Sequence, residues 1–229
     1  MNLFNFLKSR ICKGKVLNDG DSFANVMDLI ESLESKYSKE EQIIVIDFVM
    51  EIIRRDLQYD ILTTVLYEKE HFEKSLDAIP FPLRFYDQDE NELRIESCDD
   101  YKTIDLSSNC VLSMPWHRYR LLNAILNLKN QDFIYDEKNH MSYYIPELEI
   151  TIVYNGFHST GVGVGFSKGN IRAQVLSVRS LFNHVITDGL YWYNKHTKEK
   201  LEQRYGELRV EDFRFGVLYE LARKKYAME

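Results

Sequence analysis

Apolar residues recur at helical spacing through the first third of the chain. The pattern over residues 21–37 predicts one helix, and the apolar face over 43–66 predicts a second. Ser38–Glu41 has the residues of a capping box, in which a serine and a glutamate cap each other's backbone N–H groups, so the second helix is expected to start here. The polar residues at 56–60 indicate a kink or a break. We expect these helices to supply hydrophobic core or a surface for a partner.

The prolines within Ile79–Pro82 interrupt this pattern, because proline lacks a backbone donor and restrains the residue before it. Beyond them, short runs of alternating residues predict strands and hairpins. These runs occupy residues 83–95, 111–115, 133–144, 150–154, 171–178 and 185–193. Two further helices are predicted, one after Pro115 and one over 211–226. The sequence thus predicts the α+β class, with an N-terminal helical region over 1–80 and, over 81–229, a mixed α/β sheet domain that ends in a C-terminal helix.

The stretch Glu147–Val178 carries most of the candidate chemistry. Its first part alternates as a strand does and ends at Asn155-Gly156, a strong turn dipeptide because both residue types tolerate positive φ. Two alternatives exist for the backbone beyond this turn. In the first, Ser159 or Thr160 caps a helix, whose free N–H groups and positive dipole end would form an anion site.

In the second alternative, the segment after the turn is the return strand of a hairpin. Val162, Val164 and Phe166 alternate with three glycines, which is the pattern of a strand. A glycine inside a helix costs about 1 kcal/mol relative to alanine, so local propensity favours the hairpin. Tertiary packing can override a preference of this size, and both alternatives therefore stay open.

The order of a strand, an Asn-Gly-x-His turn, a short element and a second strand resembles the ParB and sulfiredoxin-like superfamily. The matching residues are Asn155, Gly156, Phe157 and His158, with the strand at 171–175. The resemblance spans about residues 111–178. Proteins of this superfamily hold nucleotide phosphates at the motif and use them for CTP-gated DNA clamping, ATP-dependent phosphoryl transfer or nucleic-acid cleavage. Where the superfamily has an arginine after the histidine, this chain has Ser159. The segment also resembles an uncharacterised bacterial family that shares an Asn-Gly-x-His-Ser core.

The resemblance implies a site that holds phosphate oxygens on backbone N–H groups at the start of the helix. His158 would donate a hydrogen bond to a phosphate or act as an acid or base. The other residues expected to bind the ligand are Asn155, Gly156, Ser159, Thr160, Arg118, Arg120 and Arg172. The arginines would replace the charge that the superfamily takes from the missing arginine. Two of them lie near the predicted start of a helix, where they oppose its dipole.

Composition and charge narrow the class of protein. The 229 residues are 45% hydrophobic, which is typical of a globular chain. The formal net charge of -7 argues against a large nucleic-acid surface, and the segment that holds the turn is the least acidic part of the chain. Three widely spaced cysteines fit a reducing compartment, and neither a signal-peptide pattern nor an apolar run long enough for a membrane span is present. We expect a cytoplasmic protein that does not contact a membrane.

Three functional hypotheses result. The first is a bacterial or phage protein that binds a nucleotide, with or without Mg²⁺, or another phosphorylated ligand at the Asn155–Thr160 turn. The second is a non-catalytic protein-interaction or defence accessory module, which would bind a protein partner through the N-terminal helices. The third is a metal-dependent nuclease, which the acidic charge disfavours. No metal-binding motif is evident, and enzyme status stays open. Hydrolysis or phosphotransfer would need a metal-bound carboxylate near the turn, and the candidates are Asp132, Asp136, Glu147 and Glu149.

Overall fold

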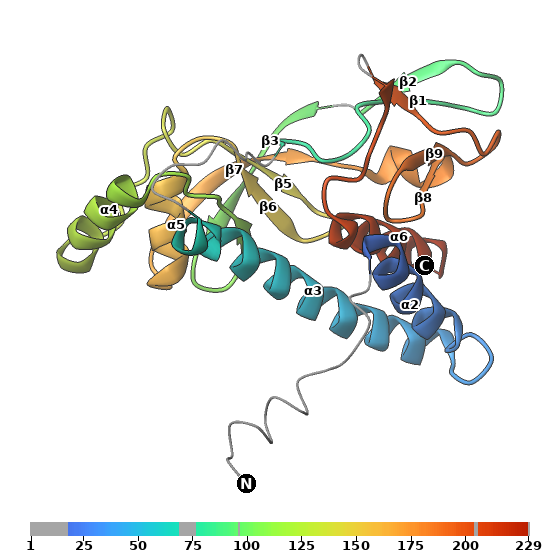
Figure 1. Ribbon diagram of the computed structural model, residues 1–229, viewed down its shortest axis with the longest axis horizontal. Helices are drawn as coiled ribbons and strands as arrows, with labels where there is room; N and C mark the ends of the chain where they lie inside the picture. The colour runs from blue at the N-terminus through green and yellow to red at the C-terminus, as the bar shows by residue number, and fades with distance from the viewer. Residues whose placement is uncertain (1–17, 69–76, 96, 204–205, 229) are drawn as a thin grey trace, which may run out of the picture.

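The computed structural model describes residues 18–68, 77–95, 97–203 and 206–228. They fold into helices around mixed β-sheets, which confirms the α+β class (Figure 1). The helices are α2 (Asp19–Glu31), α3 (Lys39–Tyr67), α4 (Arg118–Asn130), α5 (Phe157–Gly165), α6 (Phe213–Met228) and the short 3-10 helix η1 (Arg179–Asn183). The strands are β1 (Arg84–Tyr86), β2 (Glu92–Arg94), β3 (Ser97–Asp105), β4 (Cys110–Leu112), β5 (Ser142–Ile145), β6 (Ile150–Val153), β7 (Asn170–Leu176), β8 (Val185–Thr187), β9 (Trp192–Asn194), β10 (Glu202–Gln203) and β11 (Gly206–Glu207).

Helix α3 starts at the predicted capping box. Ser38 Oγ accepts a hydrogen bond from the Glu41 N–H at 3.3 Å, and the Glu41 carboxylate accepts one from the Ser38 N–H at 2.8 Å, so the capping box is confirmed. The break predicted in the middle of this helix does not occur. Arg214 of α6 pairs with Asp56 at 2.8 Å and with Asp60 at 2.6 Å, and this bridge holds two acidic residues one turn apart in a continuous helix.

The central sheet has the strand order β3-β7-β5-β6-β4 and mixes both kinds of pairing. β4 runs parallel to β6 and β5 parallel to β7, while the pairs β3–β7 and β5–β6 are antiparallel. Alternate residues of β6 point to opposite faces. Ile150 and Ile152 join the main hydrophobic cluster, whereas Val153 packs in a second cluster with Val164 of α5. One face of the sheet therefore packs toward α3 and α6, and the other toward α5.

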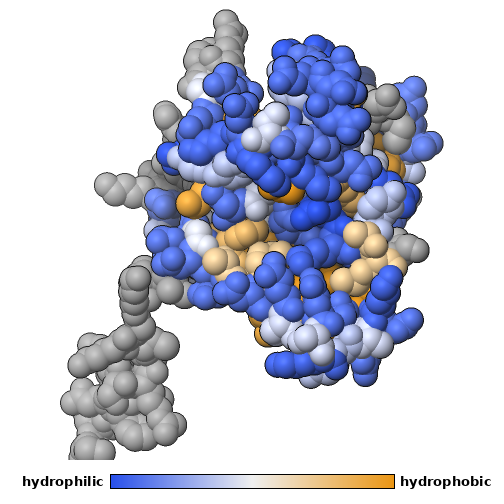
Figure 2. All heavy atoms as spheres, turned by 90° about the vertical axis from the view of Figure 1, so that its right-hand side faces the viewer, coloured by the Kyte–Doolittle hydropathy of each residue, from blue (hydrophilic) through white to orange (hydrophobic). Residues whose placement is uncertain are grey.

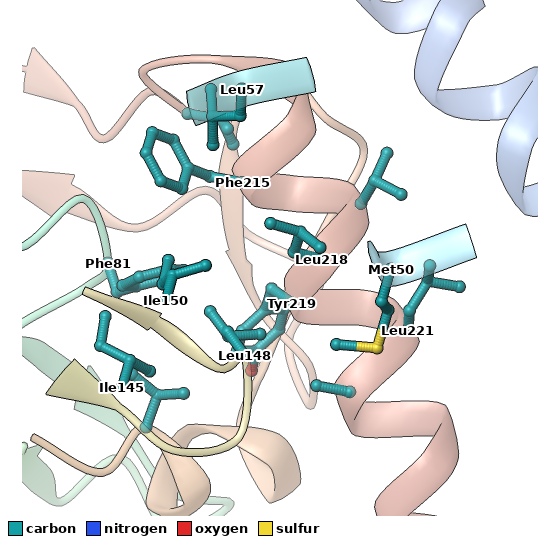
Figure 3. Packing of buried hydrophobic residues seen from close by; sticks show 14 of the residues in the cluster. Met50, Leu57, Phe81, Ile145, Leu148, Ile150, Phe215, Leu218, Tyr219 and Leu221 are labelled. Atoms are coloured by element: carbon teal, nitrogen blue, oxygen red, sulfur yellow. The ribbon is translucent and has the colours of Figure 1, made fainter. Parts of the chain in front are cut away.

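Helix α6 lies in the middle of the main cluster (Figure 3). Its side chains Phe215, Leu218 and Tyr219 are completely buried and project between the strands and α3. Met50 and Leu57 approach them from α3. The cluster thus takes residues from both sides of the boundary predicted at residue 80, so the helical region and the mixed region share one core.

The predicted strands are present with one exception. The hairpin of β8 and β9 turns at Asp188-Gly189, where Gly189 has a φ of +84°. The exception is the segment 133–144, in which the prediction of paired strands was wrong, because only its last residues enter β5. Phe133 packs into the second hydrophobic cluster instead. Strands β3, β10 and β11 were not predicted.

The surface carries both hydrophilic and hydrophobic residues. Hydrophilic residues cover most of the face shown in Figure 2, with hydrophobic residues in a broken band across its middle. Several apolar side chains of α3 are exposed to solvent, including Ile44, Phe48 and Ile52. Within the described ranges, no helix is both long and apolar enough to cross a membrane.

Candidate functional site

The segment after the Asn155-Gly156 turn forms the helix α5, so the hairpin alternative is wrong. The N-cap also differs from the prediction. It is Gly156, whose φ of +79° lies in the left-handed region, while Ser159 and Thr160 lie inside the first turn. Asn155 stabilises this arrangement, because its side-chain oxygen accepts a hydrogen bond from the Gly156 N–H at 3.0 Å.

The glycines of α5 allow a close approach to its neighbours. A Cβ at Gly161 would lie 2.9 Å from Leu62 Cδ1 of α3 and 3.0 Å from Pro115 Cγ. A Cβ at Gly163 would lie 2.5 Å from Leu106 Cδ1. Larger side chains would therefore push α5 away from α3 and from the sheet. The burial that this contact allows outweighs the propensity cost of about 1 kcal/mol for each helical glycine.

A recess of about 420 Å³ lies between the N-terminus of α5 and one side of α4, and we call it the α5 recess. Its lining residues are Trp116, Arg120, Asn123, Ala124, Asn127, Asn139, Asn155, Gly156, Phe157, His158 and Ser159. Five of the eight predicted site residues belong to this set. They are Arg120, Asn155, Gly156, His158 and Ser159.

The start of α5 has the properties of an anion site. A helix N-terminus presents N–H groups that lack intrahelical partners, at the positive end of the helix dipole. Gly156 has no side chain that could cap these groups. Arg120 adds a guanidinium 5.0 Å from the Trp116 ring centroid, and in the described part of the chain no carboxylate forms an ion pair with it. None of the described lining residues is acidic, so the recess is favourable for negative charge.

His158 is held in its neutral form. Its Nε2 accepts a hydrogen bond from the His117 N–H at 3.2 Å, and its ring packs edge-on against Trp116 at a centroid distance of 5.5 Å. Burial lowers the pKa of His158 below its ordinary value of 6.5, and the nearby Arg120 and His117 lower it further. Because Nε2 is an acceptor, the single proton of the neutral ring lies on Nδ1. His158 can therefore donate one hydrogen bond from Nδ1 to a ligand.

A second histidine, His140, orients Ser159. Its Nδ1 accepts a hydrogen bond from the Asp136 N–H at 2.9 Å, which places the proton on Nε2, and Nε2 then donates to Ser159 Oγ at 2.8 Å. The Ser159 hydroxyl in turn donates to the Gly156 carbonyl at 3.2 Å. His140 is only 4% exposed. The sequence did not single it out for the site, because a histidine 19 residues from its partner carries no local signal.

Three predicted site residues do not line the α5 recess. Arg118 donates hydrogen bonds to the carbonyls that end α3, at 3.0 Å to Val65 and Leu66, and also contacts Glu68. Arg172 of β7 lines a different recess, together with Tyr101 of β3 and Tyr154. Thr160 is completely buried, and its hydroxyl has no hydrogen-bond partner among the described residues. These side chains therefore do not reach the start of α5 from the solvent side.

The four acidic residues considered for catalysis also lie outside the α5 recess. Glu149 pairs with Arg54 at 2.6 Å, and Asp132 pairs with Lys168 at 3.2 Å. In the ranges that the structure describes, no group of three or more His, Cys, Asp or Glu side chains could hold a metal ion. The chemistry that the recess itself offers is anion binding and a hydrogen bond or proton from one histidine.

Comparison with known proteins finds one match. The model of a family described as "Family of unknown function (DUF6710)" matches residues 8–229. No curated protein and no solved structure matches the chain. The matched range includes both α4 and α5, and with them the whole α5 recess. The chain therefore belongs to the DUF6710 family.

Proposed function

We propose that the α5 recess binds the phosphate of a nucleotide or of another phosphorylated small molecule, in a bacterial cytoplasm. The observation that carries this proposal is the meeting of a helix N-terminus and the guanidinium of Arg120 in a recess without an acidic residue in its described lining. In a chain with a net charge of -7, such a recess is a local exception that favours an anion.

Each part of the lining has a role in this proposal. The backbone N–H groups at the start of α5 donate to phosphate oxygens, and Arg120 supplies a charge-assisted hydrogen bond. Asn123 and Asn127 lie one turn apart on α4 and can donate to or accept from a sugar or a base. His158 donates from Nδ1. Because a bound phosphate favours the protonated ring, binding is expected to strengthen as the pH falls toward the pKa of His158.

The resemblance to the ParB and sulfiredoxin-like superfamily supports the same site. A strand (β6), the Asn155-Gly156 turn, a helix (α5) and a second strand (β7) follow one another in the expected order. The superfamily's arginine is replaced by Ser159. In this proposal Arg120 of α4 takes over its charge, from the opposite wall of the recess. Mg²⁺ would enter with the nucleotide.

A thermal-shift panel with ATP, CTP, GTP, their diphosphates and inorganic phosphate, each with and without Mg²⁺, tests this proposal. A ligand at 100 times its dissociation constant stabilises a protein by about 2.7 kcal/mol, which is about 5–10 °C for a chain of this size. We expect such a shift for at least one phosphorylated ligand. We expect Arg120→Gln and His158→Ala to reduce it.

Arg209→Gln is a matched control, because Arg209 is also exposed and lies 5.1 Å from an aromatic ring, that of Tyr191, but outside the α5 recess. It should leave the shift unchanged. The proposal fails if no ligand in the panel shifts the melting temperature of the wild type. It also fails if Arg209→Gln weakens the effect as much as Arg120→Gln does.

A second candidate function, protein interaction, is favoured by the exposed face of α3. Ile44, Phe48 and Ile52 follow one another at a spacing of four residues and are 68%, 65% and 52% exposed. Apolar side chains in a row on a helix are typical of a helix-packing surface. A second copy of the chain is the simplest partner, since a two-fold pair brings the same stripe together from both sides.

Sedimentation velocity over a range of protein concentrations tests this second candidate. The wild type is expected to self-associate, and Phe48→Glu is expected to abolish the association without lowering stability, because Phe48 is largely exposed. Tyr67→Glu is a control at the end of α3, where the tyrosine is 82% exposed. A wild type that stays monomeric at every concentration would exclude self-association through α3.

A further inference from the structure

A second recess, of about 560 Å³, lies on the open part of the central sheet, and we call it the tyrosine recess. Three tyrosines from separate segments line it: Tyr101 of β3, Tyr154 after β6, and Tyr135 in the loop before β5. Arg172 and Gln174 of β7 also belong to the lining. The volume is within the range of small-molecule sites, which is about 300–1,000 Å³.

The strand register explains why these groups meet. Residues directly opposite each other on neighbouring strands point to the same face of a sheet. Tyr101 of β3 lies opposite Gln174 of β7, and Tyr143 of β5 also pairs with Gln174. The same face carries Arg172, two residues before Gln174. Aromatic and polar side chains of the three adjacent strands β3, β7 and β5 thus form one continuous surface at the base of the tyrosine recess.

Two of the three lining tyrosines stack on a neighbouring ring, which holds them in a fixed orientation. Tyr154 stacks on Tyr143 at a centroid distance of 4.9 Å and an interplanar angle of 29°. Tyr135 stacks on the ring of His140 at 6.0 Å, also at 29°. Rings held in this way lose little conformational entropy when a ligand binds, which is a property of effective binding surfaces.

The guanidinium of Arg172 is available for an anion. It lies 4.5 Å from the centroid of the Tyr101 ring, and among the described residues no carboxylate forms a salt bridge with it. An arginine held over an aromatic ring keeps the edge of its guanidinium free to bind a carboxylate or a phosphate. The lining also contains Lys138 and Glu137, whose opposite charges offset each other, so Arg172 leaves the recess with a net positive charge. This arrangement favours a ligand that carries negative charge beside a flat ring.

The remaining polar groups can recognise the edge of such a ring. Burial raises the pKa of Tyr135 and of Tyr154 above the ordinary value of 10.0, so these two hydroxyls stay protonated at neutral pH and can donate hydrogen bonds. Gln174, which lies on the same face as Tyr101, carries both a donor and an acceptor in its side-chain amide.

We propose that the tyrosine recess is a second ligand site, which takes a planar heteroaromatic ring that carries an anionic group, as a nucleoside monophosphate does. The ring lies against Tyr154 and Tyr135, the hydroxyls and Gln174 contact its polar edge, and the anionic group pairs with Arg172. This site is separate from the α5 recess, with which it shares no lining residue. It does not depend on the function proposed there.

Saturation-transfer NMR on the full chain tests this site with AMP, GMP, CMP and UMP as probes. 2-Naphthoate is a second probe, which has a flat ring and a carboxylate but no sugar or phosphate. We expect transfer to the ring protons of at least one nucleotide. Arg172→Gln should weaken its binding at least about tenfold, because a charge-assisted contact is lost. Tyr154→Leu should abolish the transfer.

Arg179→Gln is the matched control, because Arg179 is exposed and lies 4.3 Å from the ring of Tyr226, outside both recesses. It should leave binding unchanged. Should Tyr154→Leu fail to fold, Arg172→Gln alone still tests the site, since Arg172 is exposed.

Binding of 2-naphthoate but of no nucleotide, with the same response to Arg172→Gln, would keep the ring-plus-anion chemistry and assign an aromatic acid as the ligand. The proposal is overturned if no probe receives saturation, or if Arg172→Gln binds as the wild type does. A loss of binding in Arg120→Gln alone would assign the nucleotide to the α5 recess, and would overturn this proposal while supporting the other.

Discussion

Replacing the hydroxyl of Thr160 by a methyl group is expected to stabilise the protein. Thr160 is completely buried, and its Oγ1 has no partner among the described residues. The usual acceptor for a helical threonine is the carbonyl four residues earlier. That carbonyl belongs to Gly156, and it already accepts hydrogen bonds from the Thr160 N–H at 3.0 Å and from Ser159 Oγ at 3.2 Å. Both of its lone pairs are therefore in use.

The magnitude follows from the cost of burying a hydroxyl without a hydrogen bond, which is about 1–3 kcal/mol in protein mutational data. Thr160→Val keeps the shape of the side chain and removes this cost. We expect the free energy of unfolding to rise by about 1 kcal/mol, and the melting temperature by about 2–4 °C for a chain of this length. Urea denaturation with linear extrapolation measures the first quantity, and calorimetry measures the second.

Thr187→Val is a matched control, for which we expect the free energy of unfolding to fall rather than rise. The Thr187 hydroxyl donates to the Tyr191 carbonyl at 2.7 Å and accepts from the Gly189 N–H at 3.0 Å, so its removal should cost about 1–2 kcal/mol. A loss of stability in Thr160→Val would refute the reasoning. It would mean that the Thr160 hydroxyl binds a water or a ligand in solution, and that Thr160 belongs to the site after all.

Three further outcomes can be measured. Gly165→Ala should raise the free energy of unfolding by up to about 1 kcal/mol, because a Cβ there meets no atom within 4 Å. Gly163→Ala should lower the same quantity by several kcal/mol in the same urea assay, because its Cβ would lie 2.5 Å from Leu106 Cδ1. Arg118→Gln should lower the free energy of unfolding by about 2 kcal/mol, because the carbonyls at the end of α3 lose a charged hydrogen-bond donor. Phosphate binding by this variant should not change. Burial lowers the pKa of both His140 and His158 below 6.5, so these histidines bind protons more readily in the unfolded chain than in the folded chain. Stability should therefore fall from about pH 7 to about pH 5, and His158→Gln should make this fall shallower.

Elements with a local signal were predictable from the sequence. The capping box at the start of α3 needs residues only three positions apart, and both of its hydrogen bonds form. The β8–β9 hairpin follows from Asp188-Gly189 in the same way. The local signals for helix α5 conflicted, and the cap residues that the sequence offered, Ser159 and Thr160, lie inside the helix. Its glycines argue against a helix locally, and the reason for them is contact with Leu62 and Leu106, which no short stretch of sequence contains.

The part of the candidate site that is made of adjacent residues was predictable from the sequence, and the part that depends on packing was not. Asn155, Gly156, His158 and Ser159 are neighbours in the chain, so one turn motif brings them to one place. The arginines depend on packing. Arg118 and Arg120 lie two residues apart on α4, yet the first ends up at the end of α3 and only the second reaches the recess. Periodicity predicts a helix but not its rotation against its neighbours.

The position of α6 in the main core has a consequence for the order of folding. Arg214 bonds to Asp56 across 158 positions of the chain, and Phe215 and Tyr219 complete a cluster that α3 begins. Bringing such distant segments together costs loop entropy before any contact compensates for it, which slows folding. The apolar faces of α2 and α3 that pack on α6 are therefore expected to stay exposed until α6 docks late in folding.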